Sequence, residues 1–328
     1  MANTITVGTR DSLLAIVQAE LVVSALRKHF PNDSFPIDGS KTTGDLDTKT
    51  ALRDFEGTGI WTTDLQNRLI NGEVDIVVHS LKDVQTTLPE STVLGAITIR
   101  DDPRDVLVIK EALVKKHGYK HISELPEGSI IATSSIRRVA LLARKYPHLK
   151  FKDVRGNLPT RLRKMEDDPE MSALVTAAAG LARMNWENRI SQYLDADNGG
   201  ILYAVGQGAL GIECRAGDER VLQALQKLEN PDTLLPCLAE RSMLRELNGG
   251  CSVPIGVETK WADGKLKLRA TVVSADGKEG VDIELEEPVD TRERAEDMGK
   301  KAASELVAKG ADKILDAIIK ASPHGNTQ

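Results

Sequence analysis

Residues 74–80 read VDIVVHS, an almost continuous apolar run that is typical of a buried β-strand. A helical pattern covers residues 61–71 just before it, and residues 4–9 (TITVGT) and 35–42 predict two earlier strands. Because strands and helices alternate in this way, the first hundred residues predict an α/β domain built on a doubly wound sheet.

The first helix is expected directly after residues 4–9. Ser12 can cap its start, since a serine hydroxyl accepts a hydrogen bond from a main-chain amide of the first turn. The apolar positions expected to face the core, up to about residue 28, are Leu14, Val17, Leu21 and Val22. Residues 41–59 are polar and contain glycines, and they predict a loop of the kind that often covers a binding site.

The same alternation restarts after the charged junction DDPRD at residues 101–105. Further strands are predicted at 105–110, 129–135, 151–157 and 172–180. With helices between them, these strands predict a second α/β domain over roughly 105–200.

The last part of the chain changes to β-runs at 254–260, 265–274 and 281–286. The turn ADGK separates them twice, and its Asp-Gly pair favours a hairpin. A helix is expected over residues 236–247, and a helical tail interrupted by Gly310 follows the strands. This part therefore predicts a third, α+β domain.

The bulk composition is that of an ordinary globular protein with two or three domains, since 41% of its 328 residues are hydrophobic and 28% are charged. No basic segment precedes an apolar stretch at the N-terminus, and no apolar run reaches the roughly 18 residues of a membrane span, so we expect a cytoplasmic protein that does not contact membranes. The net charge of −6 argues against nucleic acid as a partner. Three cysteines without a CxxC pair predict reduced thiols and no metal site.

Arginines recur where the predicted strands end. In TSSIRR (133–138), Ser134 or Ser135 can cap a helix, and the two arginines that follow match the geometry of carboxylate or phosphate. Open α/β sheets bind ligands at the carboxyl ends of their strands. The sequence therefore predicts a ligand with several carboxylates near Arg10, Arg137, Arg138, Arg155, Arg161 and Arg183.

Lys82 and Asp83 follow the strand at 74–80 in the motif HSLKDV. A cation and a carboxylate would then both line the cleft, and Asp83 among positive charges could stabilise a cation that develops on a substrate. An ordinary ion pair within a loop is an equally good interpretation of these two residues.

Cys251 differs from the other two cysteines because it lies among turn residues, in LNGGCSVPIG (247–256). Cys214 and Cys237 lie in apolar stretches and are expected to be packed thiols. An exposed thiol at Cys251 can be a nucleophile, an attachment point or a residue without a role, and no histidine near it in sequence supports a Cys–His pair.

In chain order, the motifs GTRDSLLA, TTGD, HSLKDV, TSSIRR, RGNLPTRL, GQGALGIECR and LNGGCSVPIG resemble those of the porphobilinogen deaminases, also called hydroxymethylbilane synthases. The resemblance runs over about residues 5–260. It implies an α/β fold with two doubly wound lobes like type II periplasmic binding proteins, plus a small α+β C-terminal domain. Domain 1 would comprise residues 1–103 and 203–225, domain 2 residues 104–202 and domain 3 residues 226–328.

The resemblance also implies an activity. Such a transferase joins four porphobilinogen molecules head to tail on a dipyrromethane cofactor, releases ammonia at each step and finally hydrolyses the chain to hydroxymethylbilane, as part of tetrapyrrole and heme biosynthesis. Cys251 would hold the cofactor through a thioether, and Asp83 would be the catalytic carboxylate. The cofactor would also contact Ser12, Lys82, Asp83, Thr133, Ser134, Arg137, Arg138, Arg155 and Gly156. The substrate would contact Arg10, Ser12, Arg138, Arg155, Arg161, Arg183 and Gln207.

One region departs from the family pattern. Family members commonly carry lysines at two positions that Thr58 and Thr63 occupy here. Lys49 or Arg53 is expected to replace the missing positive charges.

Two other classes of function fit parts of the sequence. A non-enzymatic protein with two lobes and an arginine-lined cleft would capture a polyanion, but it would leave Cys251 without a role. A cysteine-dependent acyl or thiol transferase would need a base near that cysteine, and the sequence supplies no obvious one. The family resemblance favours the deaminase and implies a monomer.

Overall fold

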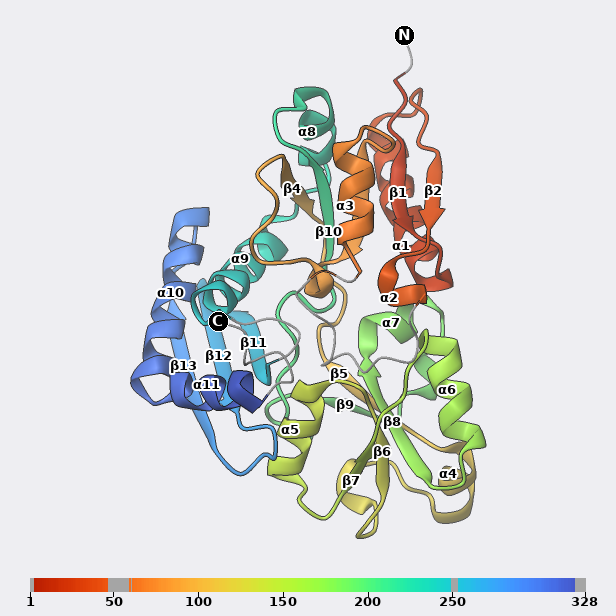
Figure 1. Ribbon diagram of the computed structural model, residues 1–328, viewed down its shortest axis with the longest axis vertical. Coiled ribbons are helices and arrows are strands. Elements are labelled where there is room, and N and C mark those ends of the chain that lie inside the picture. The colour runs from red at the N-terminus through yellow and green to blue at the C-terminus, as the bar shows by residue number, and fades with distance from the viewer. Residues whose placement is uncertain (1–2, 47–58, 60, 249–252, 322–328) are drawn as a thin grey trace.

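The computed structural model describes residues 3–46, 59, 61–248 and 253–321, and it contains three sheets that lie in three separate parts of the molecule (Figure 1). Two sheets have five strands each, and the third has three. Among the described residues, no helix is long and apolar enough to cross a membrane.

The first sheet has the order β2-β1-β3-β10-β4. Its strands are β1 (Val7–Arg10), β2 (Ile37–Ser40), β3 (Ile76–Ser80), β4 (Thr92–Ile97) and β10 (Leu210–Arg215). β1 is parallel to β2 and β3, whereas β10 is antiparallel to both β3 and β4. Its helices are α1 (Leu13–His29), α2 (Thr43–Leu46), α3 (Thr63–Ile70) and α8 (Glu219–Gln226).

Helices cover both faces of this sheet, as the doubly wound prediction requires. On β3, Ile76 and Val78 pack in one cluster with residues of α1 and α8, whereas Val77 packs with α3 on the other side. Alternate residues of a strand point to opposite faces of the sheet, so the contacts of β3 show that helices lie on both faces. The α/β prediction for the first part of the chain is therefore confirmed.

Ser12 caps α1 as predicted, since its hydroxyl accepts from the amide of Ala15 (3.4 Å). The predicted core face of α1 is partly wrong, because Leu21 is 49% exposed. The buried face instead includes Ala15, Ala19, Val22 and Leu26. Two alanines at this face let the helix approach the sheet closely, and the apolar pattern alone did not reveal that choice.

The second sheet has the order β7-β6-β8-β5-β9. Its strands are β5 (Asp105–Ile109), β6 (Ile130–Ala132), β7 (Lys150–Lys152), β8 (Met171–Ala177) and β9 (Gln192–Leu194). Its helices are α4 (Glu111–His117), α5 (Ile136–Lys145), α6 (Leu158–Asp167) and α7 (Ala178–Arg183). Successive residues of β5 again divide between two clusters, one with α5 and the other with α6 and α7.

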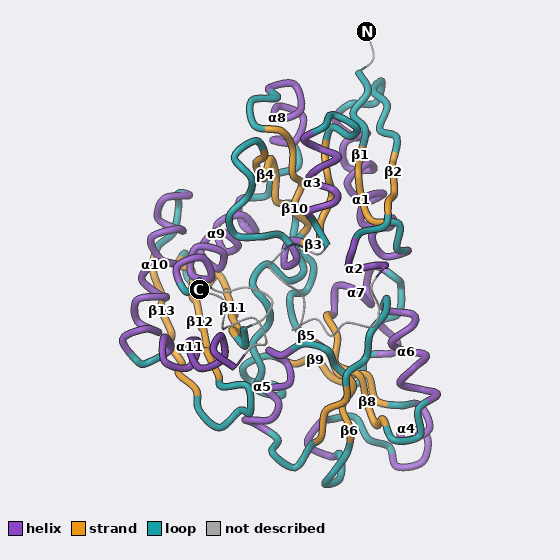
Figure 2. Tube along the Cα trace, in the orientation of Figure 1, coloured by secondary structure: helices purple, strands orange, loops and turns teal. Residues whose placement is uncertain are grey.

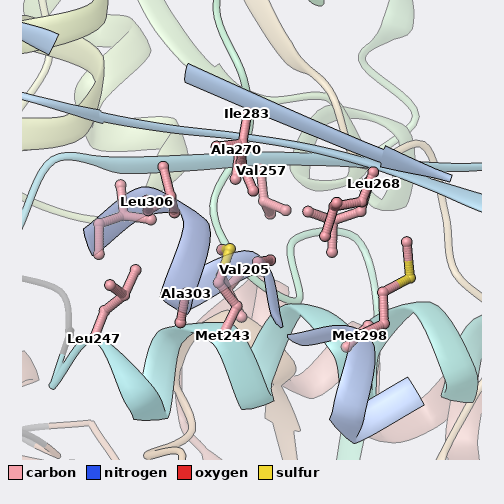
Figure 3. Packing of buried hydrophobic residues seen from close by; sticks show 14 of the residues in the cluster. Val205, Met243, Leu247, Val257, Leu268, Ala270, Ile283, Met298, Ala303 and Leu306 are labelled. Atoms are coloured by element: carbon pink, nitrogen blue, oxygen red, sulfur yellow. The ribbon is translucent and has the colours of Figure 1, made fainter. Parts of the chain in front are cut away.

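The third sheet consists of β11 (Ile255–Ala262), β12 (Lys265–Val273) and β13 (Gly280–Glu287), all antiparallel. Asp263 and Gly264 have φ of 49° and 75°, which is the hairpin geometry predicted from ADGK. The helices α9 (Pro231–Glu246), α10 (Arg292–Ala308) and α11 (Ala311–Ala321) cover this sheet. Figure 3 shows Met243 of α9 and Leu247, which directly follows α9, turned toward the strands.

α9 begins five residues before its predicted start at residue 236. Asn230 accepts from the amide of Thr233 (3.0 Å), and Pro231 occupies the first turn, where its missing amide costs nothing. Pro236 lies inside the helix. Because proline has no amide N–H, it cannot donate the usual helical hydrogen bond to the carbonyl of Asp232, four residues earlier. The indole of Trp261 donates to that carbonyl instead (3.0 Å), so the helix continues through the proline.

The chain crosses between the first two sheets through irregular segments at 98–104 and 195–209 (Figure 2). β10 follows the whole second sheet in sequence but lies between β3 and β4 of the first. The returning segment, expected in domain 1 from residue 203, enters the first sheet only at Leu210. Tyr203 and Val205 lie in the core of the third domain, because Tyr203 pairs with the main chain of Val257 (2.8 and 3.0 Å).

Candidate functional site

Lys82 and Asp83 lie on a single 3-10 turn, Leu81–Asp83, that directly follows β3. Leu81 is buried and anchors the turn. The side chains of Lys82 and Asp83 are half-buried at the carboxyl end of β3. Burial around the Lys82 ammonium group, together with nearby Arg138, lowers the pKa of this lysine to about 8 against the opposing effect of Asp83.

A buried chain of polar groups joins Lys82 to the second lobe. The Lys82 ammonium donates to the amide oxygen of Gln207 (3.4 Å), and the Gln207 amide nitrogen donates to Asp105 Oδ1 (2.9 Å) and to the carbonyl of Pro103 (2.8 Å). Gln207 belongs to the returning crossover and Asp105 is the first residue of β5. The chain of contacts therefore passes through both connections between the lobes.

Asp105 also holds the two arginines of TSSIRR. Arg137 donates to Oδ2 (2.7 Å), and Arg138 donates to Oδ1 through Nε (3.1 Å) and Nη2 (2.8 Å). Burial alone would raise the pKa of Asp105, but the charges of both arginines outweigh it and lower the pKa. Ser135 caps α5 by accepting from the amide of Arg138 (3.4 Å), which fixes the arginines on its first turn.

Ser134 acts differently from the predicted alternative of a cap. Its hydroxyl donates to the carbonyl of Val154 (2.5 Å) and accepts from the Val154 amide (3.2 Å). These bonds connect the segment after β6 to Val154. The next residue, Arg155, is buried. Thr133 is buried next to Ser134, and its hydroxyl accepts from the amide of Ser135 (3.3 Å).

Arg161 completes the cationic group from the first turn of α6. Its Nε donates to the carbonyl of Gly156 (2.6 Å), where the backbone has φ of 116°, a conformation that favours glycine. Burial and the nearby charges of Arg138 and Arg155 lower the pKa of Arg161 to about 10, against the effect of Asp83. Asp83 follows Lys82 on the same turn, and Lys82 is joined to the arginines of the second lobe through Gln207 and Asp105.

Arg10 and Arg183 are held by other carboxylates. Arg10 forms an ion pair with Asp45 of the TTGD motif and lies over the ring of Trp61, 4.1 Å from its centroid. Arg183 donates to Asp101 (2.8 Å) and to the carbonyl of Gly208 (2.7 Å). The structure therefore places these two arginines at the crossover and loop segments that flank the central cluster.

We refer to Lys82, Asp83, Asp105, Arg137, Arg138, Arg155, Arg161 and Gln207 as the cleft cluster. Cations outnumber carboxylates in it, and most of its members are buried or half-buried. A ligand with several carboxylates would neutralise the excess charge in a setting where such pairs are strong. Among the described residues, no group of His, Cys, Asp and Glu is arranged to hold a metal ion.

The comparisons with known proteins identify the family of the chain. A family model described as porphobilinogen deaminase, dipyromethane cofactor binding domain, matches residues 5–223, and the model of the porphobilinogen deaminase C-terminal domain matches residues 234–308. The chain belongs to the porphobilinogen deaminase family.

Relatives from fungi and cyanobacteria support the same assignment over nearly the whole chain. A porphobilinogen deaminase of Neurospora crassa is 49% identical over 319 residues, which cover 96% of this chain and 94% of that protein. One of Synechococcus elongatus is 46% identical and covers 97% of this chain and 96% of its own. Among solved structures, the periplasmic aliphatic sulphonate binding protein SsuA from Escherichia coli matches 75% of this chain and 70% of that chain, with 13% identity and a TM-score of 0.38.

The porphobilinogen deaminase cysteine motif lies partly outside the described residues, and Cys251 with it. The prediction of packed thiols at Cys214 and Cys237 is confirmed, since both are fully buried and burial raises their pKa to about 11 and about 12. Lys49, Arg53 and Thr58 also lie outside the described residues. Thr63 is the exposed first residue of α3.

Sequence reasoning missed two acidic residues that pair with the predicted arginines, Asp105 with Arg137 and Arg138, and Asp45 with Arg10. The sequence pattern predicts a charged junction around Asp105 and a loop around Asp45, although Asp45 lies on the short helix α2. The available signal for Asp105 was its place at the first position of a buried strand, where a carboxylate must have partners.

A cavity of about 680 Å³ lies elsewhere, between α5 and the third sheet. Its lining includes Arg144, Arg269 and Asp282, and none of the cleft cluster. Arg144 and Asp282 form an ion pair there (2.7 Å), and Arg269 pairs with Glu284 (2.7 Å), so these charges are already compensated.

Proposed function

We propose that this protein is a hydroxymethylbilane synthase, a transferase that condenses four porphobilinogen molecules on a dipyrromethane primer and then hydrolyses the product. The observation that carries the proposal is the cleft cluster, in which five cations gather with only two carboxylates, the half-buried Asp83 and the buried Asp105. Each added pyrrole would bring carboxylates into the cleft, and the excess of positive charge would accommodate them.

The cofactor is proposed to be attached to Cys251 through a thioether, and its carboxylates fit the donor set of the cleft. Lys82, Arg138, Arg155 and Arg161 would bind carboxylates directly, because their positive charges exceed those that Asp83 and Asp105 compensate. Arg137 is engaged by Asp105 and by the carbonyl of Leu202 (2.6 Å), which favours a role in shaping the site.

The other predicted contacts lie around this centre. Ser134 and Thr133 would present main-chain and hydroxyl groups at the end of β6, and Gly156 would allow close approach of the ligand. Arg10, Ser12, Arg183 and Gln207 would border the cleft on the side of the first lobe and the crossovers. Arg10 and Arg183 would exchange a protein carboxylate for a ligand carboxylate when they bind the growing chain.

Asp83 would carry the chemical step. Breaking the bond between the aminomethyl carbon and nitrogen of porphobilinogen releases ammonia and leaves a positive charge that extends to the pyrrole nitrogen. A fixed carboxylate near that N–H stabilises the charge while the ring carbon of a second pyrrole attacks the cationic methylene carbon, forms the carbon–carbon bond and then loses its proton. The bound primer supplies the pyrrole carbon that attacks first.

The same proposal covers the setting of the reaction. We propose a cytoplasmic monomer that acts on porphobilinogen without nucleic acid, a membrane or a metal as partner. The family match supports the enzyme over a two-lobed polyanion-binding protein, which would bind its ligand reversibly.

The test is the stoichiometry of turnover. Purified protein incubated with porphobilinogen should release four ammonia molecules for each hydroxymethylbilane formed. Reversible binding of porphobilinogen without ammonia release would contradict the proposal and favour the binding-protein alternative.

A further inference from the structure

We propose that Arg241, on helix α9 of the third domain, is a positioning residue that holds the Lys82–Asp83 turn in place. This inference rests on the proposed function, because it assigns Arg241 to the placement of the carboxylate that acts on the substrate. Through α9, the turn would be coupled to the domain that carries the cofactor cysteine.

The first observation is a pair of contacts between distant parts of the chain. The Arg241 guanidinium donates through Nη1 to the carbonyl of Val84 (3.0 Å) and through Nη2 to the carbonyl of Gln85 (2.6 Å). These two carbonyls belong to the residues directly after Asp83. Arg241 is only 5% exposed, so the contacts are made away from solvent.

The second observation concerns charge. Within the described residues, the hydrogen bonds of Arg241 go to main-chain carbonyls, and it forms no ion pair there. Burial lowers the pKa of this arginine to about 10, because removing the guanidinium from water disfavours its charged form. Buried carbonyls of an irregular segment also need donors. A charged guanidinium that serves two consecutive carbonyls meets both requirements and fixes the backbone that follows the turn.

The third observation is an apolar seam that joins the same elements. Leu81 and Val84, on either side of Lys82 and Asp83, pack in one cluster with Leu234 and Cys237 of α9. Asp83 therefore lies on a turn whose flanking residues are both docked on the third domain. Arg241 adds directional bonds to this non-directional packing.

The far side of α9 belongs to the core of the third domain. Met243 and Leu247 pack there with residues of the third sheet and of α10 (Figure 3). Cys251 follows Arg241 by ten positions in sequence, shortly after the end of α9. One helix thus connects the docking point of the Asp83 turn with the segment that leads to the proposed cofactor anchor.

The consequence is a specific kinetic effect. Without the two bonds, the turn would sample positions that move the Asp83 carboxylate away from the reacting pyrrole, whereas the arginines of the second lobe would stay in place. Small displacements of a catalytic group reduce the rate of the chemical step strongly. We therefore expect kcat to fall and KM to change little.

The test compares Arg241→Gln and Arg241→Lys with the control Arg245→Gln. Arg245 lies one turn further along α9, is half-exposed, and has a contact of 3.9 Å to Glu296. Each full-length protein is measured by steady-state kinetics, by intact mass for the attached cofactor, and by hydrogen exchange of the peptide that contains residues 81–88.

The proposal predicts that Arg241→Gln keeps its cofactor, loses about 10- to 100-fold in kcat with KM within about threefold, and exchanges faster at residues 81–88 only. Arg241→Lys keeps the charge and part of the bonding, so its kcat should lie between that of the wild type and that of Arg241→Gln. Unchanged exchange and kcat in both variants would overturn the proposal, and so would faster exchange throughout the protein. Failure of the proposed function is separate, because it would appear as absent ammonia release in the wild type, whereas the exchange measurement still decides the role of Arg241.

Discussion

Replacing Asp105 by asparagine should destabilise the protein more than any substitution of an exposed charge in the same segment. Asp105 accepts hydrogen bonds from Arg137, Arg138 and Gln207, and it is fully buried. Asparagine keeps the shape but removes the negative charge, which leaves two buried guanidinium groups without their counterion.

The magnitude follows from this loss. Removing one partner of a buried ion pair costs about 3–5 kcal/mol, since the remaining charge stays desolvated. With an unfolding entropy of about 2.1 cal/mol/K per residue over 328 residues, that corresponds to a decrease in Tm of about 4–7 °C. The assay is thermal unfolding at neutral pH, followed by near-UV circular dichroism.

Asp102→Asn is the matched control. Asp102 lies three residues earlier and pairs with Arg104 (2.6 Å), but both side chains are about one-third exposed, at 32% and 36%. Exposed pairs contribute roughly 0–1 kcal/mol, so this variant should unfold within about 2 °C of the wild type. Equal Tm values for the two variants would refute the reasoning about Asp105.

The pH dependence gives a second check. The pKa of Asp105 is lowered in the folded state, so its stabilising effect is present above the unfolded pKa of about 3.9 and is lost as the pH falls toward the folded value. The difference in Tm between wild type and Asp105→Asn should therefore be constant from pH 8 to about 5 and shrink only below about pH 4. A difference that disappears between pH 6 and 8 would mean that another group is responsible.

Three further predictions concern the reaction. Asp83→Asn should fold and carry the cofactor but lose at least about 100-fold in turnover, because a carboxylate near the developing charge is replaced by a neutral amide; turnover within threefold of the wild type would remove Asp83 from the catalytic role. Arg155→Leu should stop elongation early, because ligand carboxylates would be left unpaired, and intact mass should show enzyme with fewer added pyrroles than the wild type; a wild-type distribution would contradict the assignment. If cationic Lys82 binds a ligand carboxylate, kcat/KM of the wild type should decrease above about pH 8, where the lysine loses its proton. Lys82→Arg should shift this decrease to higher pH. The same decrease at the same pH in both proteins would exclude Lys82 as its source.

Much of the fold could be predicted from local patterns. The apolar run at residues 74–80 and the hairpin turn at Asp263 and Gly264 specify their own structure, because strand burial and positive φ at this Asp-Gly pair are local properties. Asn230 and Pro231 are also local signals for a helix start, but Pro236 favours a later start for α9. Its continuation through Pro236 depends on a donor from Trp261, which is distant in sequence.

The site shows the same division. Arginines after strands could be identified from sequence, since the carboxyl ends of strands form one edge of a sheet. The pairing of Arg137 and Arg138 with Asp105 could not be identified from sequence. It depends on the strand order of the second sheet, in which only β8 separates β6, which precedes the arginines, from β5, which begins with Asp105. Arg241 is a similar case, since its contacts with Val84 and Gln85 join the third domain to the first.

The most direct test of the central claim is the intact mass of the purified protein beside that of Cys251→Ser. We expect that the wild type carries the extra mass of one dipyrromethane, or acquires it after incubation with porphobilinogen, and that the serine variant does neither. A folded wild-type protein that shows no covalent addition after that incubation, and releases no ammonia, would contradict it.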